Sequence, residues 1–313
     1  MHVVVVGAGV AGLACALRLA EAGHRVEVLA AAPPLQTTSA VAAALWYPYR
    51  ALPEREVTRW AAAGFAALAG LAELEPAAGV AMRSGRELFR TATPDPWWRD
   101  AVPDLQRVPR QELPPGFADG LRLTAPVVDM GVHLPWLVDR LRELGVEVRV
   151  QPLTTLEQAG GDAVVDCAGL GARELAGDAS LLPVRGQVVV VEQVGLTAWT
   201  LAQDDPTALT YVVPRGSTVV LGGVAEEGSE VLVPDPATAQ AVLARCTALV
   251  PELTGARVVA HRVGLRPARP AVRLEAGLLT DGRRVVHDYG HGGAGVTLAY
   301  GCALDVLALV EDA

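Results

Sequence analysis

The chain of 313 residues contains no lysine, so each of its 26 basic residues is an arginine. Schiff-base chemistry, including that of pyridoxal phosphate, requires a lysine amine and is therefore excluded. The phosphate-binding P-loop also contains a lysine and is excluded for the same reason. Asparagine is absent as well. Asparagine is thermolabile, but we favour the codon bias of a GC-rich genome as the cause of both absences.

Long apolar runs are also missing, because no run reaches membrane-spanning length although 51% of the residues are hydrophobic. A strand pattern begins at residue 2, which argues against a cleaved signal peptide, and the last residues carry no targeting tripeptide. The net charge of -9 makes nucleic acids and anionic membranes unexpected partners. We therefore expect a cytoplasmic protein that binds neither.

Cysteine is scarce, and Cys15, Cys167, Cys246 and Cys302 lie far apart with no C-x-x-C pattern. We expect four buried free thiols in a reducing compartment. No pair of histidines shows metal-ligand spacing with a carboxylate, so the sequence predicts no metal site.

The amino terminus carries a dinucleotide-binding pattern. The β-branched run over 2–6 predicts a strand buried on both faces, and helical spacing begins at Leu13. Between them stands a G-x-G-x-x-G made of Gly7, Ala8, Gly9, Val10, Ala11 and Gly12. The first glycine allows a tight turn, the second lets a pyrophosphate approach the backbone, and the third lets the helix pack closely. A glycine-rich turn without a ligand is the less favoured interpretation, because the motif stands between a predicted strand and a predicted helix, as it does in dinucleotide-binding folds.

The remaining pattern alternates between helices and strands, which predicts an α/β fold. Helices are predicted over 54–74, 133–144, 237–249 and 296–310, and strands over 25–29, 146–150, 163–167, 184–194, 209–213, 217–224 and 284–288. Pro214-Arg215-Gly216 is predicted to form a hairpin turn. After the second strand, Ala30 and Ala31 stand where a Rossmann fold has a ribose-binding carboxylate, which weakens a nicotinamide reading.

Seven motifs, in this order along the chain, resemble the D-amino-acid oxidase family of flavoproteins. They are VVVVGAGVAGL (3–13), TTSAVAAALWYPY (37–49), VVDCAGLGA (164–172), PVRGQ (183–187), YVVPRGSTVVLGG (211–223), GLRPARPAVRLE (264–275) and HDYGHGGAGVTLAYGCA (287–303). The resemblance implies non-covalent FAD, a Rossmann-like FAD-binding domain with a parallel sheet, and a mostly antiparallel α+β substrate-binding domain. It assigns 1–49, 127–182 and 258–313 to the first domain, and 50–126 and 183–257 to the second.

The resemblance also implies which residues form the site. Arg266 matches the arginine that binds the substrate carboxylate, Tyr211 the tyrosine that donates to it, and Gly293 the carbonyl that receives the amine. Besides the residues of the glycine motif, the expected cofactor contacts are Thr37, Thr38, Ser39, Ala43, Ala44, Leu45, Val164, Cys167, Ala168, Gly169, Gly171, Arg266, Gly292, Gly293, Ala294, Gly295, Val296 and Thr297. The amino end of the last helix is expected to face the flavin with its partial positive charge.

The implied reaction is oxidative deamination of a D-amino acid by hydride transfer from Cα to flavin N5. Oxygen is the second substrate, and the products are a 2-oxo acid, ammonia and hydrogen peroxide. A glycine or secondary-amine oxidase and a D-aspartate oxidase are the alternatives. The family's vertebrate members carry aromatic residues where Thr207 and Ala294 stand, which predicts a roomier or differently shaped substrate pocket. His291 is expected to bond its own loop rather than to act as a base.

Two arginines are relevant to which substrate side chains the enzyme prefers. Arg215, in the predicted turn, is expected to reach solvent, and Arg50, which follows the 37–49 motif, is also expected to be solvated. Without a second cation in the pocket, an acidic side chain would lose its hydration without gaining a partner. We therefore expect neutral D-amino acids to be preferred. The sequence leaves the number of subunits open; a homodimer is one assembly that it allows.

Overall fold

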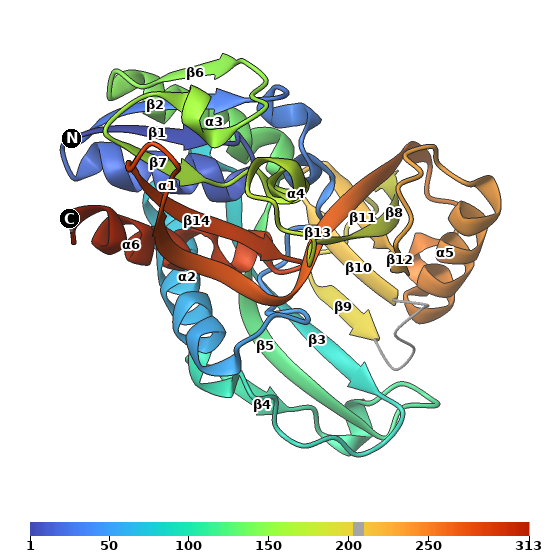
Figure 1. Ribbon diagram of the computed structural model, residues 1–313. Helices are drawn as coiled ribbons and strands as arrows, with labels where there is room; N and C mark the ends of the chain where they lie inside the picture. Colours follow the sequence, from blue (N-terminus) through green and yellow to red (C-terminus); the bar gives the residue numbers. More distant parts are fainter. Residues whose placement is uncertain (203–209, 313) are drawn as a thin grey trace.

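The computed structural model describes residues 1–202 and 210–312, in which the strands join into one mixed sheet (Figure 1). Across the sheet the order is β4 (Leu105–Arg107), β5 (Asp119–Val128), β3 (Val80–Phe89), β9 (Trp199–Ala202), β10 (Thr210–Arg215), β11 (Thr218–Gly222), β8 (Leu182–Glu192), β13 (Val258–Leu278), β14 (Arg284–His291), β7 (Ala163–Asp166), β1 (His2–Val6), β2 (Arg25–Ala30) and β6 (Glu147–Val150), while β12 (Glu226–Glu227) pairs with β8. The predicted α/β fold is confirmed. Thr207 and Leu209, which figured in the sequence predictions, lie outside the described residues.

The parallel part of the sheet runs from β14 through β7, β1 and β2 to β6. Its middle strand β1 is buried on both faces, because Val3 and Val5 join one core cluster while Val4 and Val6 join another. This two-sided burial explains why the HVVVV run lacks the alternation of a half-exposed strand. The carboxyl ends of these strands meet at one edge, which is where open α/β sheets bind their ligands.

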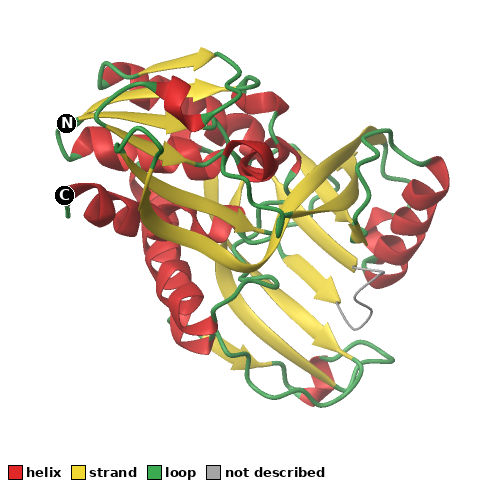
Figure 2. Ribbon diagram, viewed as in Figure 1, coloured by secondary structure: helices red, strands yellow, loops and turns green. Residues whose placement is uncertain are grey.

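The helices cover both parts of the sheet (Figure 2). They are α1 (Val10–Glu21), α2 (Glu54–Leu74), α3 (Met130–Glu143), α4 (Ala172–Leu175), α5 (Pro236–Leu249) and α6 (Gly295–Glu311). Helices α1, α3 and α6 pack together beside the parallel strands, with α2 against α6, and α5 packs on β8, β10 and β11. No helix within residues 1–202 and 210–312 combines the length and the apolar character that crossing a bilayer requires.

The antiparallel part differs from the prediction at its hairpin. The turn between β10 and β11 lies at residues 216–217, because Pro214 and Arg215 continue β10 and pair with Val219 and Thr218. Proline is tolerated there because β10 pairs with β9 only as far as Val212, so Pro214 lies beyond that ladder. The predicted turn at 214–216 was therefore wrong.

Strand β13 (Val258–Leu278) was not among the predicted strands. It pairs first with β8 and then with β14, and its register shifts between Ala268 and Arg273. The proline-rich stretch at 266–270 thus lies within a strand, with Pro267 opposite Pro183. Such a strand is hard to predict from the sequence, because proline is normally excluded from central strands. Since β13 runs through both parts of the sheet, the division into two domains stays a prediction.

Candidate functional site

A cavity of about 890 Å³ extends from the carboxyl edge of the parallel strands to the face of β8, β9 and β10. At one end it is lined by residues 6–11, at the carboxyl end of β1, and by residues 29–32, at the carboxyl end of β2. At the other end it is lined by Tyr211 and Arg266. Residues from opposite ends of the chain therefore share one elongated site.

The glycine motif forms the floor of the first end. Gly7 has φ +120°, and a Cβ on it would lie 2.3 Å from the Cys167 carbonyl oxygen. A Cβ on Gly12 would lie 2.0 Å from the Gly7 carbonyl oxygen, so both positions exclude a side chain. Ser39 Oγ accepts a hydrogen bond from the Val10 amide at 3.0 Å and ties the next segment of the wall to this turn. Backbone amides at a helix start are suited to a phosphate.

The segment 37–49 forms one side of the cavity and is held by hydrogen bonds to β10 and β13. The Thr38 hydroxyl donates to the Leu265 carbonyl at 2.9 Å, and Arg215 donates to the Ala42 carbonyl at 3.1 Å. Ala44 adopts φ +56°, an uncommon conformation for a residue with a side chain. Such local strain persists only where the surroundings enforce it, and it concentrates at ligand sites.

The amino end of α6 closes the cavity from another side. Gly293, Gly295 and Val296 line it. Thr297 lies just behind, where its hydroxyl donates to the Tyr47 carbonyl at 3.0 Å and accepts from the Tyr47 amide at 2.9 Å. This pair of bonds fixes the helix start against the 37–49 segment. The helix dipole is worth about 0.3–2 kcal/mol to negative charge placed here.

The second end of the cavity brings Arg266, Tyr211, Tyr49 and Gly293 together. The Arg266 guanidinium lies over Gly186, donates to the Val224 carbonyl at 3.0 Å, and is within hydrogen-bonding reach of the Tyr211 hydroxyl. Among the described residues no carboxylate forms an ion pair with Arg266. A half-buried arginine without a counter-ion is suited to bind an anionic ligand group.

Two tyrosine hydroxyls face this arginine. Burial raises the pKa of Tyr211 despite the opposing charge of Arg266. Burial likewise raises the pKa of Tyr49, against Arg50 and Arg266. The Tyr49 hydroxyl is buried and has no hydrogen-bond partner among residues 1–202 and 210–312. Both phenols therefore stay neutral donors at physiological pH, and that of Tyr49 has an unused donor.

Most of the predicted site residues do line the cavity. They are Gly7, Ala8, Gly9, Val10, Ala11, Thr37, Thr38, Ser39, Ala43, Ala44, Leu45, Cys167, Ala168, Gly169, Gly171, Tyr211, Arg266, Gly292, Gly293, Gly295 and Val296. Gly12, Val164, Ala294 and Thr297 lie behind the wall instead. Ala294 is fully buried in the core, so its small side chain does not enlarge the pocket.

Two other predictions concern charged residues. Arg215 is only 5% exposed rather than solvated, because it lies in β10 and not in the turn. Burial lowers its pKa. Arg50 is exposed as predicted, where it pairs with Glu227 at 3.8 Å. His291 bonds Asp288 at 3.0 Å, close to it in the chain, as expected for a residue that holds its own loop.

Sequence reasoning missed several lining residues. Tyr49 is the last residue of the 37–49 motif, but no role was predicted for it. Its proximity to Arg266 depends on tertiary contacts. Gln36 and Gln151 line the first end near Ala30, where the carboxylate is lacking. The position of Gln151 directly after β6 was the one available signal that this polar residue lines the site, because the carboxyl ends of parallel strands share an edge.

Similarity to known proteins agrees with this geometry. A family model described as FAD dependent oxidoreductase matches residues 2–309. The chain belongs to this family. Its cofactor is FAD, and the cavity fits that group: the glycines carry no side chain that would keep a pyrophosphate away from the backbone at the start of α1, and the cavity leads from there to Arg266. The residues that would hold FAD are those of the glycine motif, the 37–49 segment and the start of α6.

Individual members of this family resemble the chain over nearly its whole length. A D-amino-acid oxidase of Rubrobacter xylanophilus is 52% identical, covering 99% of this chain and 96% of the relative. A D-amino-acid oxidase of Streptomyces coelicolor is 47% identical, covering 99% and 97%. The solved glycine oxidase from Geobacillus kaustophilus has a TM-score of 0.83 at 20% identity, covering 99% of this chain and 94% of that one. This last likeness shows the fold alone.

Proposed function

We propose that this enzyme oxidises D-amino acids to 2-oxo acids with release of ammonia and hydrogen peroxide. The observation that carries the proposal is Arg266, which lines the inner end of the cavity beside Tyr211 and has no ion-pair partner among the described residues. A guanidinium binds a carboxylate through two parallel hydrogen bonds. The preference for the D-isomer rests on the two relatives named D-amino-acid oxidase.

The protein's own residues hold and orient the substrate. Arg266 and Tyr211 bind the carboxylate, and Tyr49 offers its unused hydroxyl to the same group. The Gly293 carbonyl accepts a hydrogen bond from the amine and so orients it. When bound, FAD supplies the acceptor for the hydride from Cα and passes the electrons to oxygen. Placement of this kind lowers the barrier without a side-chain base.

A basic side chain for proton abstraction is not needed by this scheme. His291, the histidine that lines the cavity, is 5% exposed and is engaged by Asp288. The substrate amine loses its proton before the reaction, and the Cα hydrogen leaves as a hydride. The electrons therefore balance with one oxygen molecule reduced per substrate.

The cavity wall supports a preference for neutral side chains. Among the described residues, Arg266 is the only arginine that lines the cavity, and its charge is assigned to the α-carboxylate. Arg50 and Arg215 lie outside the wall. A substrate with a second carboxylate would have to lose hydration without a cation to replace it. We further propose a cytoplasmic location, supported by four cysteines that are all free thiols.

A peroxide assay over a panel of D- and L-amino acids, glycine and sarcosine tests this proposal. We expect turnover of neutral D-amino acids, little of D-aspartate, and none of L-isomers. The matched control is Arg266→Ala, which should lose turnover while retaining FAD. Glycine or sarcosine as the best substrate would assign the enzyme to secondary-amine or glycine oxidation. D-aspartate as the best substrate would show that a cation reaches the side-chain pocket.

A further inference from the structure

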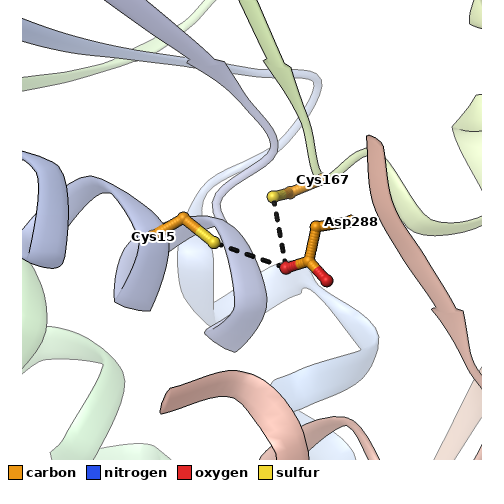
Figure 3. A group of neighbouring side chains, drawn as sticks. All are labelled: Cys15, Cys167 and Asp288. Atoms are coloured by element: carbon orange, nitrogen blue, oxygen red, sulfur yellow. Dashed lines mark hydrogen bonds between the residues drawn. The ribbon is translucent and has the colours of Figure 1, made fainter. Parts of the chain in front are cut away.

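A buried group of side chains behind the glycine motif takes no part in the proposed reaction. It contains Cys15 from α1, Cys167 directly after β7 and Asp288 from β14 (Figure 3). Cys15 Sγ lies 3.3 Å and Cys167 Sγ 3.8 Å from the same oxygen of Asp288. Figure 3 shows both thiols directed at that oxygen from different segments.

Two more donors stand around the same carboxylate. His291 Nε2 lies 3.0 Å from the other oxygen of Asp288, and the Cys302 thiol is within hydrogen-bonding reach of that carboxylate. Asp288, His291 and Cys302 offer donor atoms that all lie within 4.8 Å of one another, as do those of Cys15, Cys167 and Asp288. None of the five side chains is more than 8% exposed.

We propose that Cys15, Cys167 and Asp288 form a binding site for a thiophilic divalent cation of the Zn²⁺ type, with His291 or Cys302 as the fourth ligand. Thiolate, imidazole and carboxylate are the donors that such an ion selects. In a tetrahedral zinc site with ordinary bond lengths, a sulfur and an oxygen ligand are about 3.5 Å apart. The observed separations of 3.3 and 3.8 Å bracket this value, so small shifts suffice.

The charge of the group also suits a divalent ion. On binding, each of the two thiols releases its proton to solvent and forms a bond from sulfur to the metal, with no change in oxidation state. With His291 as the fourth ligand, two thiolates, one carboxylate and a neutral imidazole surround the ion. With Cys302 in that position, a third thiol also releases its proton to solvent and binds as a thiolate. Buried thiolates without a cation would be strongly destabilised, so ion and thiolates require each other.

The cavity provides an entry path. Cys167, Asp288 and His291 are part of its wall, whereas Cys15 and Cys302 lie behind them. An ion can therefore reach the donors from the cavity while the protein folds, before FAD covers the wall. Once bound, it would link α1, β7 and β14 across 273 positions of sequence, directly behind the turn that holds the cofactor. We expect the ion to stabilise this corner of the fold, independently of the substrate.

The test compares FAD-bound enzyme produced in zinc-supplemented and zinc-depleted media, after dialysis against a weak chelator. Elemental analysis should find about one zinc per chain from the supplemented medium, with a higher Tm than the depleted enzyme. Cadmium in place of zinc should add the ultraviolet absorption of thiolate-to-metal charge transfer. The matched control is Cys246→Ala, because Cys246 is an equally buried free thiol on α5, far from the cluster in the fold, and the metal content of this variant should be unchanged.

Variants decide the assignment. Cys15→Ala and Asp288→Asn should each lower the metal content at least tenfold, and the nearly isosteric Asp288→Asn gives the answer if Cys15→Ala does not fold. Cys302→Ala and His291→Gln identify the fourth ligand by which of them weakens retention. The proposal is overturned if the supplemented enzyme holds less than about a tenth of an ion per chain. It is equally overturned if Cys15→Ala and Asp288→Asn retain the wild-type content, since the group would then be only a hydrogen-bonded network.

Discussion

At the scale of single residues, Arg266 decides whether the site is a carboxylate site. Arg266→Ala should raise the activation free energy that corresponds to kcat/KM by about 3–5 kcal/mol, because it leaves the substrate carboxylate unpaired in a half-buried site. The value of kcat/KM should therefore fall by about two to four orders of magnitude. FAD should remain bound, since the glycine motif at the other end is untouched. Steady-state kinetics together with visible absorbance measure both. Arg257→Ala, an exposed arginine paired with Glu192, is the control that should behave as wild type.

Tyr49 offers a sharper test, because no role for this residue was predicted from the sequence. Its buried hydroxyl has no partner among the described residues, so Tyr49→Phe should leave stability nearly unchanged. If the hydroxyl donates to the substrate, the loss of this bond should raise the activation free energy that corresponds to kcat/KM by about 0.5–1.5 kcal/mol. Tyr211→Phe is the reference for a tyrosine that contacts the carboxylate. Unchanged kinetics on every substrate of the panel would mean that Tyr49 only packs against the site.

The same tyrosines shape the dependence of activity on pH. The substrate amine must be neutral to lose a hydride, so kcat/KM should rise from neutral into alkaline pH. Burial raises the pKa of Tyr211 and of Tyr49 above the usual value of about 10, which keeps both hydroxyls as donors throughout that rise. A pH series on D-alanine checks this. A maximum below neutrality would instead implicate an acid–base pair built on a histidine.

At the scale of elements, substitutions in the turn between β1 and α1 should distinguish an effect on FAD binding from an effect on folding. A Cβ at Gly9 would meet only the Ser39 hydroxyl at 3.1 Å, which can move, whereas at Gly12 it would meet the Gly7 backbone at 2.0 Å. Gly9→Val should therefore fold but purify without the yellow colour of FAD, and Gly12→Ala should lose stability itself. Visible absorbance and thermal unfolding distinguish the two. A yellow Gly9→Val protein with normal FAD affinity would contradict the assignment of this turn.

The elements also show what the sequence could and could not predict. The strand–turn–helix at 2–21 and helix α2 follow from local periodicity, and both were predicted with the correct type. The hairpin at 214–216 was placed wrongly, because Pro and Gly normally mark turns but here Pro214 lies beyond the β9 ladder. Strand β13 was missed over its whole length, because its prolines argue locally against a strand and its pairing is determined by neighbouring strands. Tertiary pairing overrides local preference at such positions.

At the scale of the whole molecule, the site is made by contacts that no local pattern encodes. Arg266 and Tyr211 were named through family resemblance, yet their proximity to Tyr49 requires three distant segments to meet. The cysteines illustrate the same limit. Cys15, Cys167 and Cys302 are far apart in sequence, and only the packing of α1, β7 and α6 gathers them around Asp288. The sequence therefore predicted buried thiols but not that they share one cluster.

One buried histidine couples the stability of the whole fold to pH. His133 Nδ1 lies 2.7 Å from the Ala78 carbonyl, and its Nε2 lies 2.9 Å from the Tyr300 hydroxyl on α6. Because a carbonyl can only accept, Nδ1 carries the proton, and Nε2 accepts from Tyr300 in the neutral ring. Burial lowers the pKa of His133 to about 4. The unfolded chain therefore takes up a proton near pH 6.5 that the folded protein resists.

This difference predicts a loss of stability in mild acid. As the pH falls from 7.5 to 5.0, His133 should lower the free energy of unfolding by about 2 kcal/mol, and by about 3 kcal/mol once the pH reaches 4. Denaturant unfolding of wild type and His133→Gln at both pH values, with FAD in excess, measures it. The variant should be less stable at pH 7.5, but its deficit should shrink by about 2 kcal/mol at pH 5.0, because it has no ring to titrate. Carboxylates with lowered pKa, such as Asp119, act equally in both proteins and cancel in this difference. A deficit that stays constant with pH would show that His133 is no harder to protonate in the fold than in the unfolded chain.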